Sequence, residues 1–303
     1  MLRRFKICVW GNTVFTEKVL RTLHESDQFH VSVVTGDSNQ NPVADYAKQN
    51  NIKILNFEKL DENSFLEFSK DLPDINIVIA YGKIIPQSFL DSSLFMNIHG
   101  SLLPDLRGAT PIQTALLHGY NKTGVTIQKM AAKMDAGEIL RQYDIGVDIQ
   151  DNFETLRDKM TNAVSQDLVK FINDYHTNRK IVPITQDENK VTTCKISDFK
   201  REKGELDWDE SIINIHDKIR AFFPEPLAWT KYEEKILNIH SSTPTDFPAT
   251  YEAATMFSRE KRLYISCRDF DLEITSLVLQ GKKKMSGRDF ANGYIKDKKI
   301  KLG

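Results

Sequence analysis

The residues best suited to chemistry lie in the run N-I-H-G-S-L-L-P at 97–104. Side chains two residues apart in a strand share a face, so Asn97 and His99 should point to the same side. Gly100 and Pro104 then end the strand and place the pair at its carboxyl end, where ligands bind in open α/β sheets. An amide donor beside an imidazole can polarise a carbonyl and stabilise a developing oxyanion. Taken alone, the motif also fits a structural histidine.

A candidate carboxylate, Asp135, follows in the run M-D-A-G-E at 134–138. Asp-x-Gly is first of all a turn signal, so a plain turn is one interpretation of this run. A carboxylate near an imidazole would, however, favour the protonated ring and fix its orientation. The residues alone leave both interpretations open.

Asn97, His99 and Asp135 must be positioned by the elements around them. The sequence pattern predicts that these elements form an α/β domain with a Rossmann-like, mostly parallel sheet. Apolar runs alternate with helix-like stretches in the first half, which is typical of βαβ units. A longer helix should begin at Asp151, because Glu154 completes a capping-box spacing and apolar residues recur at helical intervals after it. We expect strands at 5–10, 30–35, 52–55, 75–81, 94–100 and 124–130, and helices at 15–23, 43–49 and 112–119.

Glycine spacing argues against a nucleotide cofactor. Gly11 ends the first expected strand, as a nucleotide-binding fold requires, but the run W-G-N-T-V-F lacks the other glycines of G-x-G-x-x-G. Those glycines allow the close approach of a dinucleotide pyrophosphate. The chain also lacks the G-x-x-x-x-G-K-[ST] pattern. The expected sheet therefore carries no signature for NAD or ATP.

The second half has a different rhythm. A polar stretch from about Gln186 to Gly204 has little periodicity and predicts a linker, which we place at 187–204. Shorter apolar runs follow at 227–232, 235–240, 262–267 and 272–279, separated by Pro, Gly and charged turns. Such spacing is typical of a small antiparallel barrel or sandwich, and our prediction is an OB-like barrel. The expected domains are 1–186, catalytic, and 205–303, the β-barrel.

Composition limits the class of protein. At 303 residues, with 40% apolar and 27% charged residues, the chain can form two globular domains with a sizeable core. Its longest apolar runs are too short to span a bilayer, so no membrane partner is expected. The three cysteines are widely spaced and form no C-x-x-C pair, which argues against a structural metal and fits a reducing compartment. We therefore expect a cytoplasmic protein without a metal.

Positive charge gathers near the end of the sequence. Eight Lys or Arg and only two acidic residues lie between 281 and 303, although the whole chain has a net charge of −1. A basic strip on a nearly neutral protein can attract a polyanion. A solvated, lysine-rich tail would have the same composition.

Taken together, these motifs resemble one family. The run 97–140 is similar to the core of the 10-formyltetrahydrofolate-dependent formyltransferases, whose pattern is N-x-H-x-S-L-L-P, R-G, P-I, T-G-V-T and D-x-G in this order. Outside this core, the likeness is to the branch that formylates the methionine carried by initiator tRNA, so the resemblance covers nearly the whole chain. It rests on A-Y-G-K-I-I-P at 80–86, G-E-L-D-W-D-E-S at 204–211, I-R-A-F-F-P-E-P-L-A-W at 219–229 and L-Q-G-K-K-K-M-S-G-R-D-F-A-N-G-Y at 279–294.

The resemblance implies a site and a mechanism. Asn97, His99 and Asp135 take the family's catalytic positions. The folate-contacting positions fall on Ser101, Leu102, Leu103 and Pro104, with the backbone around Tyr81 and Gly82 lining the pterin pocket. The α-amino group of initiator methionyl-tRNA would attack the formyl carbon of the folate directly. The expected partners are this tRNA and the folate co-substrate, and the expected assembly is a monomer.

One loop departs from the tRNA branch of the family. Members usually carry a basic insertion after the second strand, whereas here Thr35 is followed by G-D-S-N-Q-N-P-V-A-D-Y-A, without Lys or Arg. Phosphate contacts need positive charge or exposed amides, so this loop at 36–47 should contribute little to tRNA binding. The expected tRNA contacts therefore move to Lys282, Lys283, Lys284 and Arg288.

Three alternatives remain open at this point. A sugar-nucleotide N-formyltransferase has the same core and no need of a basic loop. A 10-formyltetrahydrofolate hydrolase would use water in place of the amine. A tRNA- or folate-binding module without activity is the non-enzymatic alternative, and the presence of Asn97, His99 and Asp135 argues against it.

Overall fold

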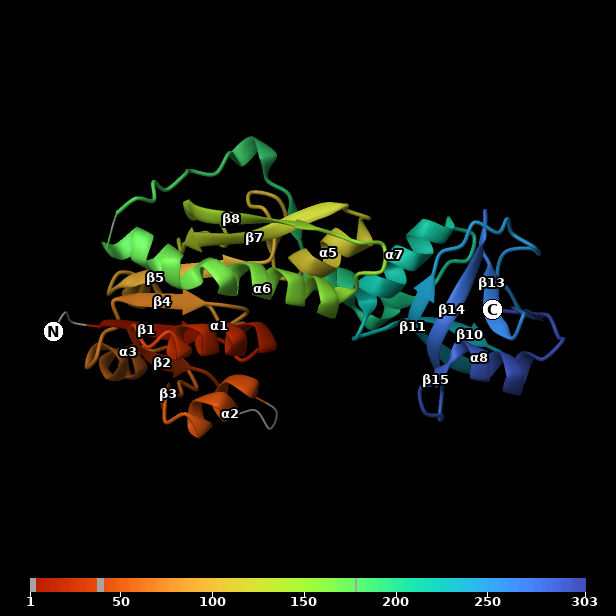
Figure 1. The fold of residues 1–303 in the computed structure, drawn as a ribbon, viewed down its shortest axis with the longest axis horizontal. Helices are drawn as coiled ribbons and strands as arrows, with labels where there is room; N and C mark the ends of the chain where they lie inside the picture. Colours follow the sequence, from red (N-terminus) through yellow and green to blue (C-terminus); the bar gives the residue numbers. More distant parts are fainter. Residues whose placement is uncertain (1–3, 37–40, 178) are drawn as a thin grey trace. The chain divides into compact units, whose positions relative to one another are not determined.

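The computed structural model describes residues 4–36, 41–177 and 179–303. Residues 37–40, part of the loop that lacks basic residues, lie outside the described residues. The chain divides into two compact units, drawn in Figure 1 and taken separately below. Unit 1 comprises Met1–Pro111, Thr123–Ile145 and Arg157–Thr193, and unit 2 comprises Ile112–Lys122, Gly146–Leu156 and Cys194–Gly303.

Unit 1 is built on a seven-stranded sheet with the order β3-β2-β1-β4-β5-β7-β8 (Figure 1). Strands β1 to β5 pair in parallel, and β5 pairs with β7 in the antiparallel sense. The expected α/β fold with a mostly parallel sheet is confirmed. The strands are β1 (Phe5–Trp10), β2 (Phe29–Val34), β3 (Lys53–Leu55), β4 (Ile75–Val78), β5 (Leu94–His99), β7 (Lys122–Lys129) and β8 (Ile139–Gly146).

Helices separate most of these strands. They are α1 (Val14–Glu25), α2 (Pro42–Gln49), α3 (Glu62–Ser69), α4 (Gln87–Leu90), α5 (Pro111–Leu117), most of which belongs to unit 2, and α6 (Phe153–Ile172), whose first four residues belong to unit 2. The expected helices appear as α1, α2, α5 and α6, while α3, α4 and strand β8 were not foreseen. Helix α6 begins two residues later than expected, because Asn152 accepts hydrogen bonds from the backbone N–H groups of Glu154 and Thr155. Asp151 instead accepts from the backbone of Asp148.

An aromatic cluster anchors one side of the sheet. Cys8 and Trp10 alternate along β1 with Ile7 and Val9, so the two pairs face opposite sides. Trp10 is fully buried, meets Phe89 of α4 edge-on, and donates from its indole to Asn76 Oδ1 at 2.9 Å. Because its ring is packed and its N–H is hydrogen-bonded, Trp10 fixes β1 beside the neighbouring strand β4.

Strand β4 ends at Val78, three residues before the expected limit. The backbone of Ala80 has φ +46° and that of Gly82 has φ +75°, and left-handed residues cannot continue a strand. The chain therefore leaves the sheet at residues 80–86, the segment that resembles a folate-side loop. Val78 lies opposite Asn97 in the parallel pairing of β4 and β5.

Unit 2 contains a separate, curled antiparallel sheet with the order β10-β11-β14-β13-β12-β16, with β15 paired to β14. Four of its strands match the expected runs. Irregular register between Ile239 and Ser242 marks a bulge, which bends β11. The strands are β10 (Ala228–Tyr232), β11 (Lys235–Thr243), β12 (Thr255–Arg259), β13 (Arg262–Ser266), β14 (Asp271–Leu279), β15 (Met285–Ser286) and β16 (Ile300–Lys301).

Two helices accompany this sheet, α7 (Ile212–Phe222) and α8 (Gly287–Phe290). The remaining short elements are β6 (Arg107–Gly108), β9 (Thr193–Cys194), η1 (Asn173–Thr177), η2 (Glu188–Lys190), η3 (Ile196–Phe199), η4 (Arg201–Gly204) and η5 (Ala291–Ile295). Helical turns η2 to η4 and strand β9 lie within the polar stretch expected as a linker. Across residues 4–36, 41–177 and 179–303, no helix has the length and apolar character needed to cross a bilayer.

Candidate functional site

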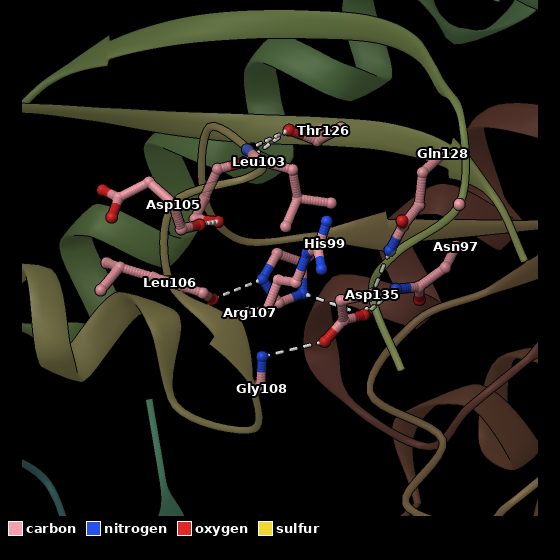
Figure 2. A network of polar contacts seen from close by, with 12 residues as sticks. Asn97, His99, Leu103, Asp105, Leu106, Arg107, Gly108, Thr126, Gln128 and Asp135 are labelled. Atoms are coloured by element: carbon pink, nitrogen blue, oxygen red, sulfur yellow. Dashed lines mark hydrogen bonds and ion pairs between the residues drawn. The ribbon is translucent and has the colours of Figure 1, made fainter. Parts of the chain in front are cut away.

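Strands β5 and β7 carry the polar face of the site. Their antiparallel register sets Asn97 opposite Gln128 and His99 opposite Thr126. Directly opposite residues project to the same face, so all four side chains share one side of the sheet. Figure 2 shows Asn97, His99 and Gln128 directed toward Asp135.

Asp135 reaches this face from the loop between β7 and β8. Its backbone φ of +52° is left-handed, a conformation that aspartate tolerates better than most residues. Gly137 follows where the loop returns against β7, and a Cβ there would lie 1.7 Å from the carbonyl oxygen of Lys129. The Asp-x-Gly run is therefore a turn, as one interpretation predicted, and the turn delivers the carboxylate to the site.

Both carboxylate oxygens of Asp135 accept hydrogen bonds. Oδ1 accepts from Asn97 Nδ2 at 3.3 Å and from Gln128 Nε2 at 3.1 Å. Oδ2 accepts from the backbone N–H of Gly108 at 2.9 Å. The side chain is only 11% exposed, so these donors replace most of the water that a carboxylate would otherwise bind.

The orientation of His99 follows from its two neighbours. Its Nε2 lies 2.9 Å from the carbonyl oxygen of Leu106, which can only accept, so Nε2 carries the hydrogen. In the neutral ring, Nδ1 then carries the lone pair. Nδ1 lies 3.6 Å from Asp135 Oδ1, too far for a hydrogen bond but close enough for an ion pair once protonated. The lone pair of Nδ1 is thus on the side of the ring that faces Asp135.

Residues 101–104 form a turn that is tied to β7. Thr126 Oγ1 donates to the carbonyl of Ser101 at 2.7 Å and accepts from the backbone N–H of Leu103 at 3.0 Å. Ser101 and Leu103 are buried, whereas Leu102 and Pro104 are partly exposed. Only the last two side chains and the backbone of this turn are open to a ligand.

Tyr81 and Gly82 lie in the loop that leaves β4 beside Asn97. The Tyr81 ring meets Trp10 edge-on at 5.3 Å, and burial raises the pKa of its phenol to about 12. Tyr81 therefore stays protonated near neutral pH. Gly82 is exposed, and a Cβ at this position would meet no atom within 4 Å.

The four candidate tRNA-binding residues belong to unit 2. Lys282, Lys283 and Lys284 lie in the turn between β14 and β15, and Arg288 lies in α8. All four are exposed. Lys284 contributes, after burial, to lowering the pKa of His240, so its positive charge reaches that neighbouring ring.

Two glutamines near Asp135 were not foreseen from the sequence. The signal for Gln128 was available, because Thr126 and Gln128 are polar residues at alternate positions of an otherwise apolar strand. Their place beside Asn97 and His99 depends on the register of β5 and β7, which the sequence does not show. Gln186 was placed at the start of a polar stretch, yet it is buried and bonded to the loop of Asp135.

Comparison with known proteins identifies the family. The formyl transferase family model matches residues 3–172, and the model of the formyl transferase C-terminal domain matches residues 198–295. The chain belongs to the formyl transferase family. Within the family, it is 32% identical to the methionyl-tRNA formyltransferase of Caldicellulosiruptor saccharolyticus, with 98% of both chains covered. The methionyl-tRNA formyltransferase of Bacillus subtilis is 33% identical, with 95% of this chain and 94% of that protein covered.

Solved structures agree with this chain in fold. HypX from Aquifex aeolicus, in complex with tetrahydrofolic acid, superposes with a TM-score of 0.72 at 16% identity, covering 97% of this formyl transferase and 49% of HypX. An N-formyltransferase from Helicobacter canadensis, in complex with folinic acid and dTDP-3-aminofucose, gives a TM-score of 0.68 at 21% identity. It covers 89% of this chain and 98% of that one.

Proposed function

We propose that the chain transfers the formyl group of 10-formyltetrahydrofolate to the α-amino group of methionine on initiator methionyl-tRNA. The observation that carries the proposal is the convergence of Asn97, His99 and Asp135 at the carboxyl end of β5. Similarity to methionyl-tRNA formyltransferases over nearly the whole chain supports the choice of acceptor.

In the proposed reaction, the α-amino nitrogen bonds to the formyl carbon and converts the formyl oxygen into an oxyanion. Asn97 stabilises that charge through its amide N–H, and His99 stabilises it as the imidazolium that forms when the ring takes the proton of the attacking amine. A partly buried pair of this kind acts strongly, because little water screens it. No covalent enzyme intermediate and no metal is required, since the amine attacks the folate directly.

The proton released by the attacking amine goes to His99, whose Nδ1 carries a lone pair and faces Asp135. Asp135 stabilises the imidazolium that forms, and Gly108 and Gln128 keep the carboxylate in place. When the bond between the formyl carbon and N10 breaks, the proton passes to N10. The products are formyl-methionyl-tRNA and tetrahydrofolate, so atoms and charges balance.

The folate is assigned to the two loops that follow β4 and β5. The turn at Ser101–Pro104 follows β5, and the segment at Tyr81–Gly82 follows β4, which pairs with β5 beside Asn97. In this proposal, backbone groups of both loops bind the pterin, and Leu102 and Pro104, which are partly exposed, offer apolar contact. Parallel strands that end side by side are the usual location of a ligand site in an open α/β sheet.

The domain assignment completes the proposal. Residues 1–186 form the catalytic domain, 187–204 a linker, and 205–303 an OB-like barrel that binds tRNA through Lys282, Lys283, Lys284 and Arg288. Their exposure and positive charge suit phosphate contacts. We further propose that the enzyme acts as a monomer in the cytoplasm.

A direct assay tests the function. The purified chain is incubated with 10-formyltetrahydrofolate and either initiator methionyl-tRNA or an amino-sugar nucleotide, and the formylated product is measured. We expect formylation of the tRNA, and turnover of the sugar alone would refute the proposal.

Asp135→Asn keeps the size of the side chain but removes its charge, so it should lower kcat by ~10²–10⁴.

A further inference from the structure

Asp135 ends a chain of hydrogen bonds that begins at Arg107. Arg107 Nε and Nη2 donate to Gln186 Oε1 at 3.0 and 2.8 Å. Gln186 Nε2 donates to Gln128 Oε1 at 3.3 Å, and Gln128 Nε2 donates to Asp135 Oδ1 at 3.1 Å. We infer that Gln128 and Gln186 are positioning residues for formyl transfer, which hold Asp135 in place through this relay. The inference rests on the function proposed above.

The direction of the relay is fixed from both ends. A guanidinium only donates, so Gln186 must present its oxygen to Arg107 and its amide nitrogen to the site. That nitrogen also lies 2.8 and 2.7 Å from the carbonyl oxygens of Asp135 and Gly137, so its two hydrogens are shared among three acceptors. At the other end, a carboxylate only accepts, so Gln128 must present its nitrogen to Asp135. Reversing either amide would set donor against donor or acceptor against acceptor.

Burial makes this order matter. Arg107 is 4% exposed, Gln186 6% and Gln128 1%, so little water can replace a lost partner. An unsatisfied buried donor or acceptor is destabilising, which disfavours the alternative orientations of both amides. The relay therefore holds the side chain of Asp135 through Gln128, and the backbone of its loop through Gln186.

The need for Gln128 arises from the proposed work of Asn97. In this structure Asn97 donates to the same oxygen of Asp135 that Gln128 binds. When the Asn97 amide turns to the formyl oxygen, Oδ1 loses one donor and would be free to move. Gln128 retains its bond and keeps Oδ1 facing His99. Asn97 can then serve the substrate without releasing the carboxylate.

Two substitutions of Gln128 separate positioning from packing. Gln128→Met keeps the volume but removes the amide donor, and Gln128→Glu keeps the shape but sets a second acceptor against Asp135. We expect kcat to fall ~10–100-fold in Gln128→Met and further in Gln128→Glu, since misplacing a catalytic group by about 1 Å costs ~10²-fold. KM for both substrates should stay within about twofold. Gln87→Met, an exposed glutamine outside the relay, is the matched control.

A double-mutant cycle tests whether the two glutamines act as one unit. Gln186→Glu still accepts from Arg107 but loses the amide donors. Alone, it should lower kcat by about tenfold. Added to Gln128→Met, it should lower kcat less than it does alone, because the side-chain path to Asp135 is already broken and only the bonds to the backbone of the Asp135 loop remain to be lost. Fully additive losses, or losses that follow the melting temperature rather than the chemistry of the side chain, would refute the relay.

A structural readout keeps this test separate from the proposed function. Crystal structures of Asn97→Ala, with and without Gln128→Met, report the position of the Asp135 carboxylate when the Asn97 donor is absent and no acceptor substrate is bound. We expect Oδ1 to stay 3.6 Å from His99 Nδ1 in Asn97→Ala, where Gln128 still donates to it, and to leave that position in the double variant. An unmoved carboxylate in the double variant would overturn the inference. If the wild type formylates no tRNA, the proposed function fails while this measurement still decides the relay.

Discussion

Two buried histidines, His99 in unit 1 and His216 in unit 2, have the same kind of partner at Nε2 and different partners at Nδ1. His99 Nε2 donates to the carbonyl oxygen of Leu106. In the same way, Nε2 of His216, in α7, lies 2.7 Å from the carbonyl oxygen of Ile149. On the other side, His216 Nδ1 lies 2.9 Å from the hydroxyl of Ser242, whereas His99 Nδ1 faces the carboxylate of Asp135 at 3.6 Å.

The difference agrees with the proposed roles, in which His216 is structural and His99 transfers a proton. His216 has both nitrogens satisfied as a neutral ring, and burial lowers its pKa to about 4. The Nδ1 atom of His99 lies beyond hydrogen-bonding distance of Asp135, and the carboxylate of Asp135 would stabilise a positive charge on the ring. Burial and a carbonyl partner are thus common to both roles. The group facing Nδ1 decides between them.

The largest expected effect comes from exchanging each histidine for glutamine. His99→Gln removes the proton acceptor and should lower kcat by ~10²–10⁴. His216→Gln removes no group that touches a substrate, so its kcat should stay within about twofold of the wild type. Steady-state kinetics with initiator methionyl-tRNA measures both. Equal losses of kcat in the two variants would show that the two histidines do not differ in role.

Asn97→Ala should have the next largest effect. It removes one oxyanion donor without changing the His99 pair, which costs ~10²–10³ in kcat. The melting temperature should change little, because Asn97 is partly exposed and Gln128 and Gly108 still hold Asp135. Near-normal kcat in this variant would remove Asn97 from the mechanism and leave the histidine to act alone.

Charge reversal in unit 2 should give a smaller, salt-dependent effect. The triple change Lys282→Glu, Lys283→Glu and Lys284→Glu should weaken tRNA binding by ~10–10² at low salt, and each lost phosphate contact should reduce the slope of log affinity against log salt by about 0.7–0.9. Binding titrations at several salt concentrations measure this. Turnover at saturating tRNA should be nearly unchanged. Lys70→Glu, on the surface of unit 1, is the control. An unaltered salt slope in the triple variant would show that these three lysines are solvated and do not contact tRNA phosphates.

The smallest expected effect is on stability against pH, and it concerns His216. Its folded pKa of about 4 lies below the ordinary 6.5, so the unfolded chain takes up the proton first as the pH falls. The stabilisation is therefore complete above pH 6.5 and is lost between pH 6.5 and 4, by at most about 3 kcal/mol. Denaturant titrations across this range should show a shallower decline in His216→Gln. Parallel curves for both proteins would show that His216 titrates normally in the fold.

Much of unit 1 follows from local pattern. The strands at 5–10, 94–99 and 122–129 and the helix at 153–172 were foreseen, because alternation and helical periodicity record which side of each element is buried. Short elements such as α3 and β8 escaped, since a few residues of mixed polarity carry little periodic signal. The end of β4 depended on left-handed backbone at Ala80, which no residue type announces.

For the site, residue types and spacing by themselves determined that Asn97 and His99 share one face of a strand and that Asp135 lies in a turn. Only the tertiary structure decided that the turn brings Asp135 to that face, and that Gln128 and Gln186 stand behind it. The physical reason is register: the pairing of β5 with β7 sets side chains about 30 positions apart in direct opposition. Local sequence specifies which way a side chain points, and only the packed sheet specifies what it meets.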